Sequence, residues 1–452
     1  MARALACDVV VAGAGMAGAT LALALQSGGL KPILVDPMPF DTQTAPTFDG
    51  RASAVAFSCF RQWRALGVGQ RLESQAQRIE QILITDGRLP GAAPGLKLPA
   101  FLRFDSAEIA ERLRPQAKWE PVRRPEGAES FDGAHSDAEP LHTSAECARN
   151  EPLGYLIENR HIRAALARQV KAAKITVLAP ARVAGLEVRG EGVVVRLEDG
   201  RTIEAPLVIG SDGRGSLVRR EAGIGVVGWP YPEVGVVATV KLSRPHKGVA
   251  HEHFLPSGPF AILPLTEDRA SLVWTEKAAR GRALAAARPE VFHAHLNRRF
   301  GDFVGPASLD GKVFVYPLAL ELAEAMTAPR IALLGDAAHG VHPIAGQGLN
   351  LGLKDAAALA EVLVEASRIG EDLGSEVVLE RYARWRRTDN LALAAATDLF
   401  NRLFTNDIAP LRLIRGAGMA LVNRIGPARR FFMQEAGGAT GDLPRLLRGE
   451  AL

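Results

Sequence analysis

The sequence predicts an α/β fold in which a Rossmann-like domain is interleaved with a β-sheet domain and followed by a helical C-terminal region. The first observation is a β-branched run at residues 8–12 that leads directly into glycines at fixed spacing. The second is a series of short apolar runs between residues 226 and 317 that alternate with turn residues, as in an antiparallel sheet. The third is helical spacing of apolar residues from Leu353 almost to the end of the chain.

Composition limits the class of protein. The chain has 452 residues, of which 47% are apolar and 23% charged, and at about 150 residues per domain this predicts two or three globular domains. Apolar stretches end well before the ~18 residues that a membrane span needs. The odd, widely spaced cysteines are typical of a reducing compartment, and Asp8 interrupts the apolar N-terminus, so we expect a cytoplasmic protein rather than an exported one.

The glycines after the first expected strand form a G-x-G-x-x-G motif that opens a helix. Its members are Gly13, Ala14, Gly15, Met16, Ala17 and Gly18. The glycines permit a tight turn, a close approach of a pyrophosphate and packing of the helix on the strand. Asp36 ends the next expected strand, where a carboxylate binds ribose hydroxyls and disfavours a 2′-phosphate. The motif and Asp36 together predict a dinucleotide-binding site. The alternative is a glycine-rich turn that binds no ligand. These residues alone do not distinguish NAD from FAD.

Motifs later in the chain distinguish an FAD site from an NAD site. The segment DGRASAVAFS contains Arg51, GSDG occupies residues 210–213, LGDAAH occupies 334–339, and HPIAGQGLNLG occupies 342–352. With these motifs in this order, the sequence resembles the class A flavoprotein aromatic hydroxylases of the para-hydroxybenzoate hydroxylase superfamily. The resemblance implies a glutathione-reductase-type FAD-binding domain. It makes the later motifs part of the cofactor site, with contacts from Arg51, Arg160, Asp212, Gly335, Asp336, Gly346, Gly348, Leu349 and Asn350.

The chemistry of the last motifs fits a flavin. Asp336, at the end of a strand, can accept a hydrogen bond from a ribityl hydroxyl, and the two glycines of GQG let the chain run close to a planar ring. The helix that begins near Leu349 would direct its N-terminal amides at the flavin N1–C2 edge. Arg160 can instead be an ordinary residue at a helix N-terminus, and Asp212 an ordinary turn aspartate. We expect the flavin itself to carry the bond chemistry, with an active-site lining of His342, Pro343 and Gln347, although packing or capping is equally open for His342.

A narrower resemblance follows from TDLFNRLFTND at residues 397–407, EPLGYLIENR at 151–160 and GPFAILPL at 258–265. These segments resemble the ubiquinone-biosynthesis hydroxylases, the UbiH/UbiF/VisC group. The resemblance implies ring hydroxylation of a polyprenyl phenol or quinone precursor by O2 through a flavin C4a-hydroperoxide, in contact with other ubiquinone-biosynthesis proteins. NAD(P)H or a ferredoxin would be the reductant, and the nicotinamide would bind transiently because a second G-x-G-x-x-G is absent. An apolar sheet face with Phe254, Phe260, Leu263 and Leu265 is the expected place for the tail.

The expected domains are discontinuous. Residues 1–76, 153–225 and 318–365 form the FAD-binding domain, 77–152 and 226–317 form the substrate domain, and 366–452 form the Arg-rich helical region. Residues 88–150 are rich in proline and poor in aromatic residues, so we expect a mobile insertion there. Residues 381–452 contain twelve arginines and no lysine. They predict either a solvated surface or peripheral contact with anionic lipid on the inner face of the cytoplasmic membrane.

Other classes stay open or are excluded. A soluble flavin hydroxylase of a small aromatic compound or secondary metabolite is one alternative. A non-catalytic binding protein with an FAD fold is another, against which the intact GDAAH and GQGLN motifs argue. His251 and His253 share a strand face without a third ligand, so no metal is expected. No nucleic-acid motif accompanies the basic tail. The oligomeric state does not follow from the sequence.

Overall fold

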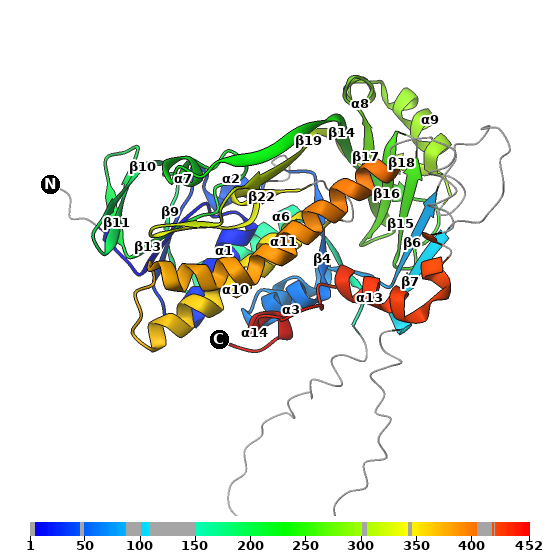
Figure 1. Ribbon diagram of the computed structural model, residues 1–452. Helices are drawn as coiled ribbons and strands as arrows, with labels where there is room; N and C mark the ends of the chain where they lie inside the picture. The colour runs from blue at the N-terminus through cyan, green and yellow to red at the C-terminus, as the bar shows by residue number, and fades with distance from the viewer. Residues whose placement is uncertain are drawn as a thin grey trace, which may run out of the picture.

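The computed structural model describes residues 5–45, 49–86, 101–108, 151–255, 257–300, 305–341, 346–404, 418–419 and 421–452. The chain forms an elongated molecule with three parts in a row (Figure 1). A small sheet lies at one end, a parallel sheet with its helices lies in the middle, and a large, mostly antiparallel sheet lies at the other end. The fold is therefore the predicted mixed α/β arrangement.

The central sheet begins with two strands that are joined through one helix, a connection that makes the two strands parallel. Four of its strands are buried on both faces, as expected for apolar runs such as VVVA and LVIG. In spatial order its strands are β20 (Thr327–Ala328), β21 (Ile331–Leu333), β13 (Leu207–Gly210), β2 (Val9–Ala12), β3 (Pro32–Val35) and β9 (Thr176–Leu178). Only β20 is antiparallel to its neighbour among the strand pairs described in this sheet.

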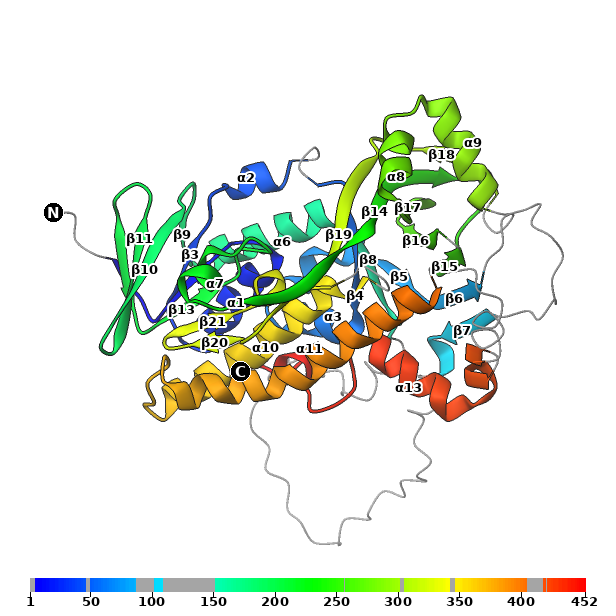
Figure 2. The ribbon, with the colours of Figure 1, turned by 45° about the horizontal axis from the view of Figure 1, so that its top comes forward.

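Helices and a small sheet enclose the parallel sheet. The core on one face includes residues of α1 (Met16–Ser27), α6 (Asn159–Ala172) and α10 (Gly348–Arg368), and α11 (Glu376–Phe404) runs beside α10 (Figure 2). The core on the other face includes residues of the small sheet. The small sheet consists of β1 (Leu5–Ala6), β12 (Thr202–Ala205), β11 (Gly192–Leu197) and β10 (Val183–Arg189).

The large sheet carries two helices on one face, α8 (Ala278–Ala285) and α9 (Pro289–Phe300). Its strands in spatial order are β22 (His339–Gly340), β19 (Phe314–Ala323), β14 (Val226–Leu242), β17 (Arg269–Lys277), β16 (Gly258–Leu265), β15 (Val249–Leu255), β6 (Gln81–Asp86) and β7 (Phe101–Asp105), with β18 (Ala307–Leu309) beside β14. The long strands β14 and β19 run from the central part into this sheet (Figure 1).

The remaining elements join these parts. A three-stranded sheet lies between the central part and the large sheet (Figure 2), and short helices complete the chain. They are β4 (Ala52–Ala56), β8 (Gly154–Glu158), β5 (Gln77–Ile79), α2 (Phe40–Gln43), α3 (Phe57–Ala65), α7 (Leu217–Glu221), α13 (Gly426–Ala436) and α14 (Arg445–Arg448). No helix in the described part of the chain combines the length and apolarity that crossing a membrane requires.

Two expectations differ from the structure. Strand β7 lies inside the stretch 88–150 that was expected to be a mobile insertion, and it pairs with β6 because Leu102 and Phe104 bury their side chains in the core. Most of that stretch lies outside the described residues. Phe260 does not share a face with Phe254, Leu263 and Leu265, because it belongs to the core under α8 and α9 whereas the other three belong to the opposite face.

Candidate cofactor and active site

The glycine motif lies at the carboxyl edge of the parallel sheet, where β2 lies between β13 and β3. Chain connections leave β2 and β13 in opposite directions across the sheet, and such a switch point is where open α/β sheets bind ligands. Gly13 has φ +104°, and a Cβ on it would lie 2.2 Å from the Ser211 backbone oxygen. A Cβ on Gly18 would lie 2.1 Å from the Gly13 oxygen. These two glycines are therefore required by the close approach of the chain to itself.

Asp36 lies beside the motif, as predicted. One carboxylate oxygen accepts from the Ala14 backbone N–H at 2.7 Å and the other accepts from the Met38 N–H at 2.8 Å. Burial raises the pKa of Asp36, and these two backbone donors oppose the rise. The carboxylate is thereby held at the edge of the glycine turn, in the position that a ribose hydroxyl of a dinucleotide would require.

Open space lies above two helix N-termini. A Cβ on Gly15, the residue before α1, or on Gly348, the first residue of α10, would meet no atom within 4 Å. Backbone amides at a helix N-terminus favour anionic groups. The residues present therefore fit FAD, with room for its pyrophosphate at α1 and for the flavin edge at α10.

The segment before α10 is held against β4. The Asn350 side chain accepts from the Ala56 N–H at 2.9 Å and donates to the Ala54 oxygen at 2.9 Å, so it fixes the backbone of this segment rather than projecting into the open space. Gly346 has φ +63° and passes close to Ala54. Gln347 precedes the helix, and Leu349 packs against the central core. His342 and Pro343 lie outside the described residues.

Asp336 lies in the turn that follows β21, after Gly335 with its φ of +59°. Its side chain is 52% exposed, and its nearest charged partner is Arg214, with 3.7 Å between the carboxylate oxygen and the guanidinium nitrogen. An exposed carboxylate at a strand end can accept a hydrogen bond from a ribityl hydroxyl, and this contact stays a prediction.

We predict that Asp336→Ala lowers FAD affinity by about 10-fold to 100-fold, because a charge-assisted hydrogen bond contributes roughly 1.5–3 kcal/mol. Fluorescence titration of the apoprotein with FAD measures this. A variant that purifies fully yellow with unchanged flavin affinity would contradict the role given to Asp336.

Arg51 and Arg160 each pair with an acid of the chain. Arg51 donates to Asp49 at 2.9 Å and lies over the Tyr316 ring. The same Asp49 carboxylate accepts from Asn159 and Arg163. Desolvation opposes its ionisation, yet these hydrogen bonds hold the pKa of Asp49 well below its usual range. Arg160 pairs with Glu158 at the start of α6. The Asp49 cluster was not anticipated, although the DGR and ENR segments contain most of it.

Asp212 caps α7 from its turn. One carboxylate oxygen accepts from the Ser216 hydroxyl at 2.5 Å, and the other accepts from the Leu217 N–H at 2.7 Å. This geometry is that of the turn aspartate weighed as the alternative, and contact of Asp212 with FAD or a nicotinamide stays a prediction.

A buried ionic network, not anticipated from the sequence, supports the GDAAH turn. Asp355 on α10 accepts from the Gly335 N–H at 3.2 Å, the His339 ring at 2.5 Å and Arg386 of α11 at 2.9 Å. Asp355 is fully buried, and the side chains of His339 and Arg386 are only 2% exposed. The network thus ties the turn that carries Asp336 to two helices.

The two strand histidines lie together on the face of β15 that is turned toward Phe260, with ring centroids 6.0 Å apart. No group of three or more metal-binding side chains occurs among the described residues.

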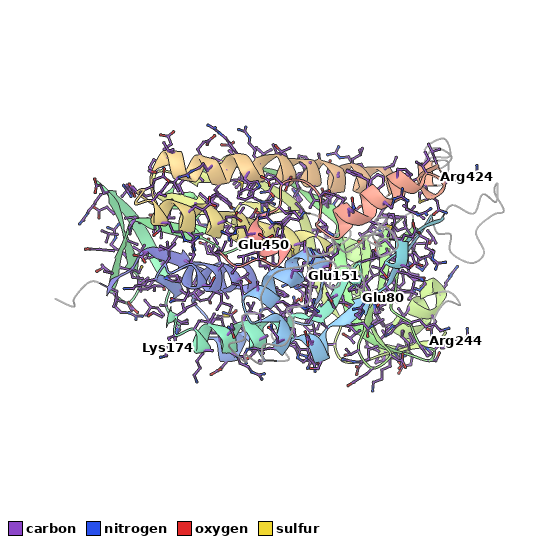
Figure 3. The ribbon with its side chains drawn as sticks, turned by 90° about the horizontal axis from the view of Figure 1, so that it is seen from below. Glu80, Glu151, Lys174, Arg244, Arg424 and Glu450 are labelled. Carbon is purple, nitrogen blue, oxygen red and sulfur yellow. The ribbon has the colours of Figure 1, made fainter. Side chains whose placement is uncertain are left out.

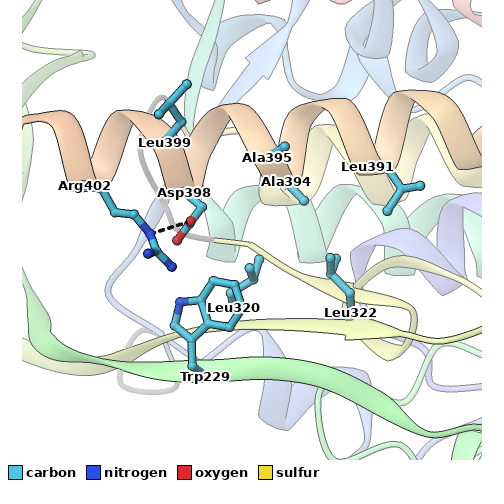
Figure 4. Close-up of a pocket in the computed structure, with 9 residues that line it drawn as sticks. All are labelled: Trp229, Leu320, Leu322, Leu391, Ala394, Ala395, Asp398, Leu399 and Arg402. Carbon is cyan, nitrogen blue, oxygen red and sulfur yellow. Dashed lines mark hydrogen bonds and ion pairs between the residues drawn. The ribbon is translucent and has the colours of Figure 1, made fainter.

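An apolar groove lies between α11 and the strands β14 and β19 (Figure 4). Its volume is about 430 Å³. At one end Asp398 accepts hydrogen bonds from Tyr231 and Arg402, and Arg402 lies over the Trp229 ring. These contacts fasten α11 to the strands. The apolar lining consists of Trp229, Leu320, Leu322, Leu391, Ala394, Ala395 and Leu399.

The Gly13–Gly18 turn, the Asp36 carboxylate beside it and the open N-terminus of α10 together fit an FAD-binding oxidoreductase. Comparison with known proteins agrees: residues 6–394 match the FAD binding domain family. Ubiquinone hydroxylase UbiL of Rhodospirillum rubrum is 40% identical over 98% of this chain and 93% of its own length. The 3-demethoxyubiquinol 3-hydroxylase of Escherichia coli is 31% identical over 94% of this chain and 96% of its own length. The chain belongs to the family of FAD-dependent aromatic-ring monooxygenases that contains the ubiquinone-biosynthesis hydroxylases.

Solved structures share the fold. p-Nitrophenol 4-monooxygenase PnpA from Pseudomonas putida superposes with a TM-score of 0.71 at 17% identity, over 97% of this chain and 99% of that chain. PqsL of Pseudomonas aeruginosa, solved with 2-aminobenzoylacetate, gives a TM-score of 0.68 at 23% identity, over 92% and 99% of the two chains.

Proposed function

We propose that this monooxygenase hydroxylates the aromatic ring of a polyprenyl phenol or related quinone precursor in ubiquinone biosynthesis. The observation that carries the proposal is the 40% identity to a ubiquinone hydroxylase over almost the whole chain, combined with a site whose open helix N-termini fit FAD. FAD, reduced by NAD(P)H or a ferredoxin, would supply the activation of O2 when bound.

The chain's own residues would bind and orient the reacting groups. The Gly13–Gly18 turn would hold the pyrophosphate, Asp36 the ribose, and Asp336 the ribityl chain. The amides at Leu349 and Asn350 would face the flavin edge, with Arg51, Arg160 and Asp212 nearby as proposed further contacts. The apolar face of β15 and β16 would exclude water from the ring to be hydroxylated.

The test is turnover by the FAD-loaded protein with O2, each candidate reductant and a prenylated phenol. The expected product gains one oxygen atom, and the same phenol without the prenyl chain reacts at least about 10-fold less efficiently, because apolar burial contributes about 0.8 kcal/mol per CH₂. Equal or better turnover of unprenylated small aromatics would favour the alternative of a soluble hydroxylase of small compounds. A protein that fails to retain FAD or to consume O2 would favour the non-catalytic alternative.

We also propose that the C-terminal segment rests on an anionic lipid surface. Leu421, Ile425, Phe431 and Phe432 are 40–58% exposed. Arg424 lies among them, at the end of the molecule near α13 (Figure 3), and Arg430 follows on α13 itself. Exposed aromatic and aliphatic side chains with neighbouring arginines are complementary to an anionic interface.

We predict that Phe431→Ser combined with Phe432→Ser abolishes sedimentation of the holoprotein with phosphatidylglycerol-containing liposomes. The matched control is Ile369→Ser combined with Val377→Ser, because these residues are 71% and 70% exposed at a different place, and it is expected to sediment like the wild type. If the wild-type protein does not sediment with such liposomes at low salt, the proposed docking is wrong.

A further inference from the structure

On one face of the large sheet, the carboxyl group of Glu252 on β15 lies between apolar residues of the two neighbouring strands. Side chains alternate along a strand, so Ala250, Glu252 and Phe254 of β15 lie on the same face. Glu252 is paired with Ile84 on β6 and with Ala261 on β16. The apolar cluster on this face includes Ile82, Ile84, Leu102, Phe104, Ala250, Phe254, Leu263 and Leu265.

This face leads to the proposed flavin segment. Ala54 of β4 packs against the same apolar cluster. The backbone oxygen of Ala54 also accepts a hydrogen bond from the side-chain amide of Asn350. A Cβ on Gly346 would lie 3.1 Å from the Cβ of Ala54. A ring bound between the sheet face and the segment 346–350 would therefore contact the surface on which Glu252 lies.

Glu252 makes no hydrogen bond or ion pair with any residue in the described part of the chain, although it is only partly exposed. Charged groups on the neighbouring strands have other partners: Arg269, paired with Leu265 in the strand register, forms an ion pair with Glu158. His251 and His253 lie on the opposite face of β15, where His253 contacts Thr85. On β7 Arg103 pairs with Asp105, and beyond it Glu108 pairs with Arg429. Burial raises the pKa of Glu252 to about 8.

An unpartnered carboxyl group on an apolar face costs free energy unless a ligand satisfies it. We propose that Glu252 is a specificity-determining residue that hydrogen-bonds a ring oxygen of the substrate. The inference rests on the proposed function. It assigns to Glu252 the contact that favours a ring with an oxygen substituent over a ring without one. A neutral carboxyl can donate to this oxygen, and an ionised one can accept from a ring hydroxyl. In either state a ring without the oxygen leaves the group unsatisfied.

The experiment measures binding to the oxidised holoenzyme by calorimetry, using 2-propylphenol and propylbenzene, which differ by one hydroxyl. We expect the wild type to prefer the phenol by about 10-fold or more, as for a hydrogen bond made to a partly desolvated group. Glu252→Met should reduce this ratio to about 1, and Glu252→Gln should retain most of it. The matched control Leu102→Ala removes apolar surface from the same face and should weaken both ligands equally.

A second measurement separates contact from a structural role. Between pH 7 and 9 Glu252 ionises, and a carboxylate accepts the phenol hydroxyl more strongly than a neutral acid does. The wild-type preference should therefore rise over this range, whereas that of Glu252→Gln should stay flat. An unchanged ratio in Glu252→Met, or a flat wild-type profile, overturns the role of Glu252 and leaves the proposed function standing. Failure of the wild type to bind either ligand overturns the proposed function and the inference with it.

Discussion

Replacing Asp355 by asparagine is expected to destabilise the folded chain by about 3–5 kcal/mol, the cost of breaking a buried ion pair on one side. Arg386 would keep its charge with a side chain that is only 2% exposed, and His339 would lose the acceptor of its ring N–H. Urea unfolding of the apoprotein measures the change. FAD affinity should fall as well, because the Gly335 N–H loses its carboxylate acceptor in the turn that carries Asp336.

Asp389 provides the matched control. It also pairs with Arg386, at 2.7 Å, but its side chain is 49% exposed. Asp389→Asn should therefore cost less than about 1 kcal/mol, as exposed ion pairs do. Equal destabilisation by the two variants would contradict the claim that the buried Asp355 carboxylate is the main stabilising partner of Arg386.

The effect of Asp355→Asn should also depend on pH. Burial alone would raise the pKa of Asp355, but His339 and Arg386 hold it well below its usual range. Burial disfavours the charged form of His339, but the Asp355 carboxylate raises its pKa above the ordinary value. The carboxylate's contribution is present above about pH 4 and is lost as pH falls toward the lowered pKa. The histidine's contribution is complete below about pH 6.5 and is lost as pH rises through the raised pKa. The difference in unfolding free energy between the wild type and Asp355→Asn should therefore be largest between about pH 4 and about pH 6.5.

Much of the parallel sheet could be predicted from the sequence because local patterns determine it. The expected strand at residues 8–12 differs from β2 by one residue at one end, and Asp36, expected to end the next strand, directly follows β3. The G-x-G-x-x-G motif identifies its own turn, since two of its glycines have no room for a Cβ. Such features depend on neighbours in the chain, and these are visible in the sequence.

The partners of the polar side chains could not be predicted in this way. Asp355 and Arg386 lie on two different helices, and nothing near either residue marks the other. Motif membership indicated Asn350 and Asp212 as site residues, but their side chains bond to the chain itself, in β4 and at the start of α7. The face of Phe260, by contrast, follows from the sequence: it lies an odd number of residues from Leu263 and Leu265 in one strand, and side chains alternate between the two faces.

Gly15→Val is expected to abolish tight FAD binding while leaving the chain folded. Gly15 has φ −63° and ψ −179°, a conformation open to valine, and its Cβ would meet no protein atom within 4 Å. The loss of unfolding free energy should be about 1 kcal/mol or less, the usual cost of a poorer N-cap. The added side chain would instead occupy the space before α1 where a pyrophosphate approaches the backbone. FAD affinity should fall at least about 100-fold, which corresponds to roughly 2.8 kcal/mol.

Gly18→Val is the contrasting variant, because its Cβ would lie 2.1 Å from the Gly13 oxygen. It should cost about 3 kcal/mol of stability through overpacking, whether or not FAD is present. Urea unfolding of the two apoproteins and FAD titration of Gly15→Val therefore separate the two functions of the motif: close packing at Gly18 and cofactor approach at Gly15. A Gly15→Val protein that binds FAD with wild-type affinity would show that the pyrophosphate does not lie over the N-terminus of α1, because no other part of the folded chain is disturbed by that side chain.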